Sequence, residues 1–343
     1  MNDVLELGLD TFGDVTLADD GSTVSQPQVI RDVVAEGVLA DSVGVDFIGI
    51  GEHHRAEFAV TTPDVVLAAI AARTERIRLG SAVTVLSSDD PIRVFQRFAT
   101  LDAVSDGRAE VILGRGSFIE SFPLFGYDLG QYDELFTDKL DLFTALLPEQ
   151  PVTWSGRTRE PLVDQQVYPR TSSGLRAWIG VGGSPESVVR AARYNLPLVI
   201  AIIGGPSDRF APYADLFRRA LDELGQAELP IAVHSPGFVA DSDEQARELA
   251  WPHYERMHNT IGAERGWGPT SRAAFEAQVG PQGAMYVGAP ETVARKIATT
   301  AKLLRLSRFD LKYSMGRLPH PHLMHSIELY GDKVIPLVRD MLA

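Results

Sequence analysis

The stretch that decides the fold is DFIGIGEHHRAEF, residues 46–58. Its apolar part, residues 47–50, is short and is bounded by a glycine and charged residues, which is typical of a buried strand in a parallel sheet. The strand leads directly into two adjacent histidines flanked by glutamates and an arginine. Because α/β folds usually place their chemistry at the carboxyl ends of parallel strands, this stretch predicts both a strand and an acid–base site.

Short apolar segments alternate with amphipathic helical sequence along most of the chain. Such alternation predicts parallel strands that are joined by helices. Eight strands in near-sequential order favour an α/β fold of the (β/α)8 TIM-barrel type over a doubly wound open sheet. We predict these strands at residues 5–9, 47–50, 76–86, 109–113, 177–181, 196–203, 231–234 and 308–313.

Two long segments interrupt this alternation. Residues from about 150 to 172, after the fourth strand, are rich in turn formers and predict an inserted hairpin or loop. The segment from about 255 to 290, after the seventh strand, exceeds a normal strand-to-helix connection and predicts a lid. Shorter loops are expected at residues 122–130 and at HPHLMH, residues 320–325. No linker divides the chain, so a single barrel domain is expected over residues 1–343.

The composition narrows the classes of partner. The 343 residues include 32 basic and 46 acidic side chains, a formal net charge of −14, which argues against a general binder of nucleic acid or of anionic membranes. The absence of cysteine excludes disulfides, thiolate metal sites and cysteine nucleophiles. The start of the chain lacks a signal-peptide pattern, and no segment approaches the roughly 18 apolar residues of a membrane span, so a cytoplasmic protein is expected.

His53 is the candidate catalytic residue, because histidine titrates near neutral pH and can exchange protons with a reacting group. The alternative is that the whole segment is a solvent-facing polar loop. A metal site is disfavoured because the adjacent rings of His53 and His54 do not both face one ion and no HxxxH pattern follows. A Ser-His-Asp hydrolase is disfavoured because the chain has no GxSxG motif.

Two glycine-containing segments are candidates for phosphate binding. GRGS, residues 114–117, places Arg115 where its planar fork can pair with a phosphate. GGSPES, residues 182–187, puts Ser184 at a helix N-cap and Pro185 at the first helical position, so that backbone N–H groups face the barrel mouth. A well-capped helix that binds nothing remains the alternative. Neither a GxxxxGK[ST] loop nor a GxGxxG fingerprint is present.

With these residues assembled, the chain resembles the bacterial luciferase-like flavin monooxygenase family, most strongly over residues 46–143 and again over 177–205. The resemblance implies that His53 lies beside the flavin and assists its oxygenated intermediate. It also implies a non-prolyl cis peptide between Ala82 and Val83, in the third strand, that supports the flavin ring.

The resemblance further implies how the flavin is held. Arg115 matches the arginine on the FMN phosphate, and Ile202 takes the place of a flavin-contacting tryptophan. Two departures stand out, because a second family arginine is replaced by Asp133 and a glutamate by Gly183; light emission is therefore not implied. The complete set of expected cofactor-binding residues is Ser81, Ala82, Val83, Gly114, Arg115, Ser117, Gly182, Gly183, Ser184, Ser187 and Ile202.

The resemblance implies a monooxygenase that uses reduced FMN and O2 to oxygenate a small organic substrate. Because no dinucleotide fingerprint is visible, a separate flavin reductase is expected to supply the reduced FMN. One alternative is hydride transfer with a deazaflavin coenzyme on the same barrel, and another is a flavin-binding protein without its own chemistry. Members of the family commonly form dimers, so a homodimer is expected.

Overall fold

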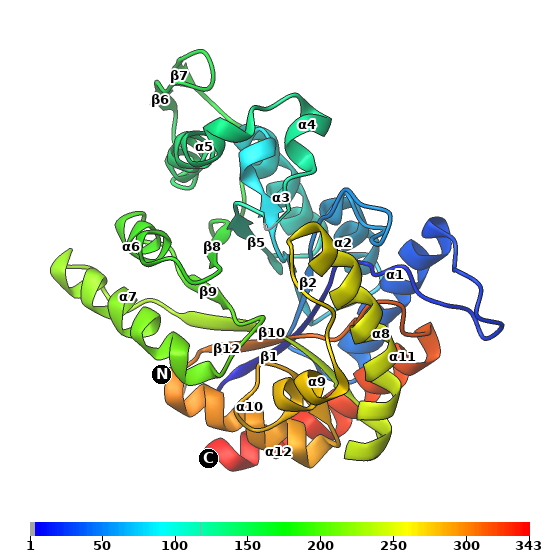
Figure 1. The fold of residues 1–343 in the computed structure, drawn as a ribbon. Coiled ribbons are helices and arrows are strands. Elements are labelled where there is room, and N and C mark those ends of the chain that lie inside the picture. The colour runs from blue at the N-terminus through cyan, green and yellow to red at the C-terminus, as the bar shows by residue number, and fades with distance from the viewer. Residues whose placement is uncertain (1–3, 117) are drawn as a thin grey trace.

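The computed structural model of the protein describes residues 4–116 and 118–343. Eight parallel strands pair in sequence order, and pairing between the last and the first closes them into a barrel with helices on the outside (Figure 1). The predicted (β/α)8 barrel is therefore confirmed. The barrel strands are β1 (Glu6–Thr11), β2 (Phe47–Ile50), β3 (Arg78–Ser81), β5 (Ala109–Gly114), β8 (Arg176–Val181), β9 (Leu198–Ala201), β10 (Ile231–Val239) and β12 (Arg308–Lys312).

The outer helices begin where the sequence supplies caps and prolines. Asp90 is an example, because its Oδ1 accepts hydrogen bonds from the N–H groups of Ile92 and Arg93, at 2.9 and 3.0 Å, in the first turn of α3. Proline at the first helical position is equally suited to this end of a helix. The helices that cover the barrel are α1 (Gln26–Ser42), α2 (Pro63–Ala71), α3 (Pro91–Val104), α5 (Tyr132–Leu146), α6 (Pro185–Arg193), α7 (Ala211–Glu223), α10 (Pro290–Leu304), α11 (His320–Leu329) and α12 (Ile335–Leu342).

The inside of the barrel is filled by side chains. The guanidinium of Arg308 is fully buried, 4.0 Å from the ring centre of Phe47 and 4.4 Å from that of Trp178. It forms an ion pair with Glu110 and another, at 3.1 Å, with Asp310. Burying these charges is tolerable because each has an opposite charge beside it. The lower half of the barrel is thus a packed core, which leaves the carboxyl ends of the strands for a site.

The third strand was predicted to be continuous over residues 76–86, but it is interrupted. It divides into β3 and β4 (Thr84–Val85) on either side of the peptide between Ala82 and Val83, which is cis, as expected. The hydroxyl of Ser81 fastens the strand at this point by donating to the Ile112 carbonyl, at 3.1 Å, and accepting from the Ile112 N–H, at 3.2 Å.

The segment after β5 contains more regular structure than predicted. The expected loop at residues 122–130 contains the short helix α4 (Ser121–Phe125), which ends at Gly126 in a left-handed conformation, and the start of a 3-10 turn (Leu129–Gln131). The predicted insert is a hairpin of β6 (Val152–Trp154) and β7 (Leu162–Gln165). The hairpin confirms the interpretation of the turn-rich sequence.

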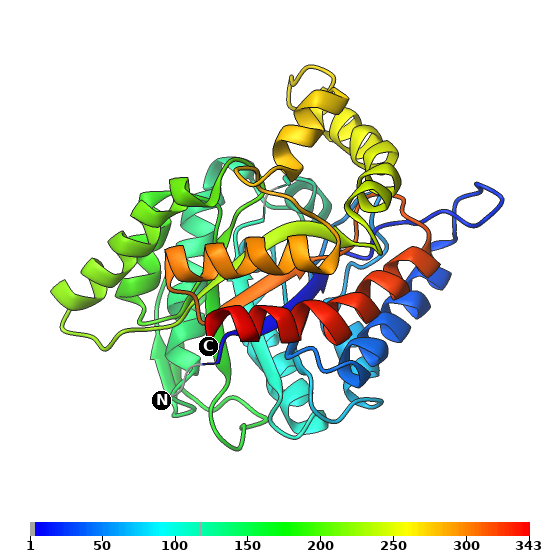
Figure 2. The same ribbon diagram turned by 90° about the horizontal axis from the view of Figure 1, so that it is seen from below.

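The segment between β10 and β12 stands out from the barrel (Figure 2). The projecting part is α8 (Asp243–Glu264) and α9 (Arg272–Val279); the chain then returns to the barrel through β11 (Tyr286–Gly288), which pairs with β10, and α10. Helix α8 ends two residues beyond Gly262, and the Trp267 N–H donates to the Gly262 carbonyl at 2.8 Å. Residues 265–271 then separate α8 from α9.

The HPHLMH segment was expected to be a loop but forms the first turns of α11. Proline at the second residue fits a helix start because its missing N–H would have no helical partner there. His320 lies 2.8 Å from Glu36 and His325 lies 3.0 Å from Asp241. These histidines therefore pair with different carboxylates.

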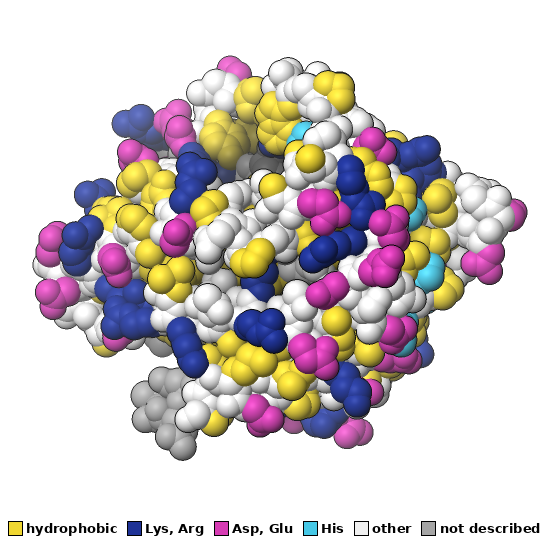
Figure 3. Space-filling view, turned by 60° about the horizontal axis from the view of Figure 1, so that its bottom comes forward, with side chains coloured by type: hydrophobic (Ala, Val, Ile, Leu, Met, Phe, Trp, Pro, Cys, Tyr) yellow, Lys and Arg dark blue, Asp and Glu magenta, His cyan; other side chains and the backbone are white. Residues whose placement is uncertain are grey.

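Charged groups of both signs are interspersed with apolar side chains on the face shown in Figure 3. Within residues 4–116 and 118–343, none of the helices combines the length and apolar character that a membrane crossing requires.

Candidate active site

His53 lies at the carboxyl end of β2 in a cage of aromatic rings. Its ring centre is 4.7 Å from that of Phe12, 4.6 Å from that of Phe58 and 4.8 Å from that of Phe118. Its backbone N–H donates to the Val60 carbonyl at 3.2 Å, which fixes the loop. Only 9% of the residue is exposed. The solvent-facing alternative is therefore wrong for this histidine.

Two carboxylates flank the histidines. Glu120 Oε1 lies 3.8 Å from His53 Nδ1; burial alone would raise the pKa of Glu120, but the interaction with His53 and the charge of Arg55 hold it below its ordinary value. Glu52 points the other way and accepts a hydrogen bond from the Val85 N–H at 2.6 Å. Burial raises the pKa of Glu52 to about 7.

His54 occupies a different environment from His53. Its ring packs edge-on against Phe125, at 5.0 Å, and burial lowers its pKa although Glu120 acts in the opposite sense. The two adjacent rings thus contact different residues. This arrangement keeps His53 as the candidate that faces the aromatic cage.

Val83 and three glycines shape the mouth beside His53. A Cβ on Gly114 would lie 2.5 Å from Val83 Cγ2, and one on Gly180 would lie 3.0 Å from Val83 Cγ1. A Cβ on Gly49 would similarly meet the Ala82 side chain at 2.8 Å. Glycine at these positions lets the residues of the cis peptide settle against neighbouring strands. Ala82 and Val83 remain partly exposed, so they are available to a ligand.

Arg115, at the end of β5, is the centre of the candidate phosphate site. It forms an ion pair with Asp133 on α5, and its Nη2 lies 3.5 Å from the Ser187 hydroxyl on α6. The Tyr132 ring lies 5.1 Å from the guanidinium. Sequence reasoning placed Arg115 and Ser187 together, and the structure brings them together. A bound anion would have to displace Asp133 from Arg115.

The start of α6 has the predicted capping geometry. Ser184 is the N-cap and its Oγ accepts from the Ser187 N–H at 3.3 Å, while its hydroxyl donates to Glu186 at 2.8 Å. Gly183 has φ +106°, which only glycine adopts easily, so the backbone requires glycine where the family has glutamate. Gly182 has no atom within 4 Å of where a Cβ would stand. The strand end is therefore open to a ligand.

Three predicted cofactor residues need separate comment. The Ser81 side chain is fully buried in hydrogen bonds to β5, so it supports the site rather than contacting a ligand. Ile202 was expected to meet the flavin, but its side chain is fully buried in the core between sheet and helices, whereas Ile203 is 65% exposed. The Ile202 assignment is wrong because side chains alternate along the strand. Ser117 lies outside the described residues.

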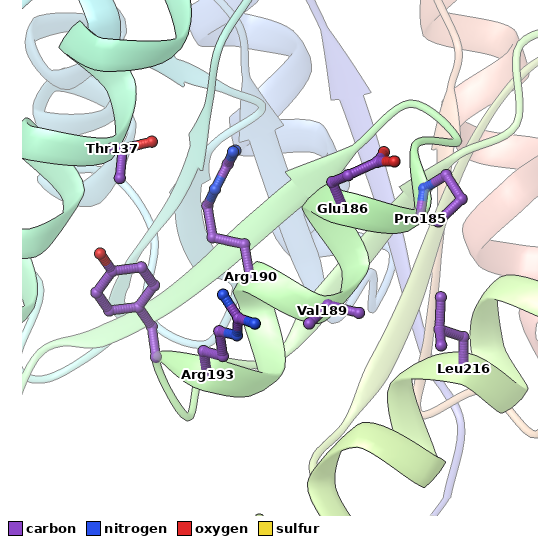
Figure 4. Close-up of a pocket in the computed structure, with 8 residues that line it drawn as sticks. Thr137, Pro185, Glu186, Val189, Arg190, Arg193 and Leu216 are labelled. Carbon is purple, nitrogen blue, oxygen red and sulfur yellow. The ribbon is translucent and has the colours of Figure 1, made fainter.

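A groove of about 650 Å³ lies beside the candidate phosphate site, between α5 and the α6–α7 pair. Figure 4 shows Arg190 and Arg193 on the α6 side of this groove, with Thr137 facing them from α5. Burial and the nearby Arg115 charge lower the pKa of Arg190. Its guanidinium lies 5.5 Å from the Phe136 ring centre, and its buried Nη1 has no hydrogen-bond partner in the described part of the chain. Arg115, Arg190 and Arg193 therefore gather at this edge, with Glu186 and Asp133 as the nearby carboxylates.

The predicted lid contacts the histidine loop directly. Arg55 forms two hydrogen bonds, of 2.7 and 2.5 Å, to Glu264 at the end of α8. The guanidinium groups of Arg55 and Arg265 lie 4.8 and 5.0 Å from the Phe118 ring centre, which is suitable for cation–π attraction. Because Phe118 also contacts His53, the end of α8 is linked to the aromatic cage through one ring.

Sequence reasoning missed a second histidine at the mouth. His234 on β10 has Nδ1 2.6 Å from Asp10 Oδ2 on β1, and its ring stacks on Phe12 at 6.1 Å. The two paired residues are 224 positions apart. The only signal in the sequence is a histidine at the end of an apolar strand.

Comparison with known proteins identifies the family of this chain. The sequence profile described as luciferase-like monooxygenase matches residues 11–306. The chain belongs to the luciferase-like monooxygenase family. It is therefore an oxidoreductase. Among its relatives is 4-hydroxyprotoasukamycin monooxygenase of Streptomyces nodosus subsp. asukaensis, which is 29% identical over 67% of this chain and 64% of the relative. The matched segment is thus slightly less than two thirds of that relative.

Several solved structures share the fold over almost the whole chain. The monooxygenase RslO1 of Streptomyces bottropensis has a TM-score of 0.83 at 22% identity, covering 97% of this chain and 99% of that one. The oxygenating constituent of 3,6-diketocamphane monooxygenase of Pseudomonas putida, in complex with FMN, has a TM-score of 0.76 at 20% identity, covering 97% and 98%. An F420-dependent secondary alcohol dehydrogenase with an F420–acetone adduct has a TM-score of 0.74 at 17% identity, covering 98% and 99%.

Proposed function

We propose that this family member is a flavin-dependent monooxygenase that uses reduced FMN and O2 to oxygenate a small organic substrate. The observation that carries the proposal is the grouping of His53, the cis peptide Ala82–Val83 and Arg115 at the ends of consecutive barrel strands. The FMN complex of the diketocamphane enzyme, which has the same fold, supports FMN as the flavin.

The residues at the mouth fit the parts of FMN. Arg115 would pair with the phosphate, and the hydroxyls of Ser184 and Ser187 with the start of α6 would donate hydrogen bonds to it. Gly114 and Val83 would lie against the ring. The open space at Gly182 leaves room for the connecting chain. Bound reduced FMN supplies the electrons with which O2 is activated.

His53 would hold or move a proton at the reacting centre. Its Nδ1 faces Glu120 at 3.8 Å, which favours a proton on that nitrogen and leaves Nε2 for the ligand. The rings of Phe12, Phe58 and Phe118 exclude water from around it. Water exclusion strengthens hydrogen bonds in the site and limits side reactions. The α8 end, held by Arg55, would act as the lid.

The reduced FMN would come from a separate flavin reductase, since the chain has no dinucleotide fingerprint. The test is to mix photoreduced FMN, O2 and the protein, and to compare peroxide release with that of free FMN. Slower peroxide release, together with its acceleration in His53→Ala, is expected. If the protein leaves the rate of peroxide release unchanged, the monooxygenase proposal fails. Oxygen use that is insensitive to His53→Ala would instead favour a flavin-binding protein without its own chemistry.

Hydride transfer with a deazaflavin is the second candidate. It is favoured by the F420-dependent neighbour and by Arg190 and Arg193 in the groove beside Arg115, which suit a longer anionic cofactor tail. Dissociation constants for FMN and F420 distinguish the two, since a preference for F420 that falls in the Arg190→Gln, Arg193→Gln double variant would replace FMN as the cofactor.

A further inference from the structure

The Asp10–His234 pair is a built feature of the mouth that the flavin does not account for. Asp10 is 1% exposed and lies 2.6 Å from His234 Nδ1, whereas the histidine side chain retains 14% exposure. The Asp10 carboxylate thus fixes the His234 ring through Nδ1. The other ring nitrogen, Nε2, is directed away from Asp10. An Asp–His pair of this kind orients the imidazole and sets its tautomer.

The place of His234 in the barrel separates it from the candidate flavin residues. Around the closed sheet the order is β1, β2, β3, β5, β8, β9, β10 and β12, so β10 is diametrically opposite β3. The cis peptide follows β3, and Arg115 and Gly182 follow β5 and β8. A flavin on that side leaves the β10 side of the mouth for another molecule.

Phe12 connects the two histidines of the mouth. Its ring meets His53 edge-on at 4.7 Å and stacks with His234 at an interplanar angle of 24°. A molecule that reaches His53 from the β10 side therefore passes over Phe12 and beside His234. This position is suited to a group that orients the substrate relative to the flavin.

The charges around His234 favour a proton donor. Burial lowers its pKa, but Asp10 and then Asp310 more than offset this, with Lys312 acting in the opposite sense, so that its pKa lies above the ordinary value. Burial also raises the pKa of Asp310, to about 7. With Nδ1–H donating to Asp10, the protonated ring carries a second N–H at Nε2, and this N–H requires an acceptor.

We propose that His234, oriented by Asp10, donates a hydrogen bond from Nε2 to an acceptor oxygen of the organic substrate. The inference rests on the proposed monooxygenase function, because it places the substrate opposite the flavin. His234 is a substrate-binding residue, and Asp10 is its positioning residue.

The test uses full-length protein with 15N-labelled histidine and two matched probe pairs, acetophenone with ethylbenzene and cyclohexanone with cyclohexane. The ketones shift the His234 ring signals and the hydrocarbons do not. In His234→Phe the ketones bind about tenfold more weakly, the loss expected for a hydrogen bond from a charged donor, while the hydrocarbons bind as before. His325→Phe is the matched control, since His325 also pairs with a carboxylate but lies on α11.

The pH dependence tests the role of Asp10. The ketone preference disappears as pH rises through the pKa of His234, because Nε2–H is then lost. Asp10→Asn moves this loss to lower pH, which a merely structural carboxylate would not do. The wild-type spectra decide the matter even where a variant does not fold. If neither ketone shifts the His234 signals, or ketone and hydrocarbon shift them equally, the proposal is overturned.

Titration of the same samples with photoreduced FMN under anaerobic conditions separates this inference from the proposed function. FMN binding with no ketone preference refutes only the role of His234. A ketone preference without any FMN binding refutes the flavin assignment and leaves the His234 contact standing.

Discussion

Replacing Asp133 with asparagine should tighten FMN binding. The Asp133 side chain is 73% exposed and pairs with Arg115, which is 28% exposed. A surface pair of this kind contributes about 0.2–1 kcal/mol, and binding of a phosphate must overcome it. Repulsion between the carboxylate and the phosphate adds about 1 kcal/mol in water-like surroundings. Removing both terms corresponds to about tenfold tighter binding, at 1.4 kcal/mol for each factor of ten.

The assay is fluorescence quenching of FMN, with riboflavin titrated in parallel. Asp133→Asn should lower the dissociation constant for FMN and leave that for riboflavin unchanged, because riboflavin has no phosphate. The control is Glu134→Gln, which alters the neighbouring residue of α5, where Glu134 pairs with Arg157 at 3.2 Å instead. If riboflavin binding tightens as much as FMN binding, or neither tightens, Arg115 does not hold the phosphate.

Three further changes test other parts of the site. His53→Gln should reduce substrate oxygenation by about 10²–10⁴-fold, as expected for loss of a proton-transfer group, while reduced FMN still binds. Glu264→Gln should weaken the contact with Arg55 and raise the fraction of O2 released as peroxide, measured against substrate oxygenated. Glu52→Gln should gain stability over the wild type as pH rises from about 4.5 through 7, by up to about 3 kcal/mol in urea unfolding.

The sign for Glu52 follows from its pKa. The folded-state pKa of about 7 lies above the ordinary value of 4.5 for a glutamate, so the native state prefers the protonated carboxyl and loses stability as pH rises through this window. A pH-independent difference between Glu52→Gln and the wild type would contradict this. Unchanged peroxide release in Glu264→Gln would show that the α8 end does not act as a lid, and full activity of His53→Gln would remove His53 from the chemistry.

The barrel was predictable because its signals are local. Each strand is a short apolar run and most barrel helices begin with a cap or a proline, so β2 was predicted with the bounds that the structure shows and α6 with its first residue. The GGSPES segment likewise predicted the capped helix start, because Ser184 and Ser187 are neighbours in the chain. In these places a few consecutive residues are enough to determine the local structure.

Other features depend on contacts between distant residues. The apolar run that forms β9 is buried on both faces, so its sequence has no alternation to show that Ile202 points into the outer core. Arg55 and Glu264 are 209 residues apart, and Asp10 and His234 are 224 apart. The sequence by itself determined the barrel strands, most of the helices and the loop that carries His53. Closure of the barrel decided the rest, because only β1 lying next to β12, and β12 next to β10, brings Asp10 to His234 at the mouth.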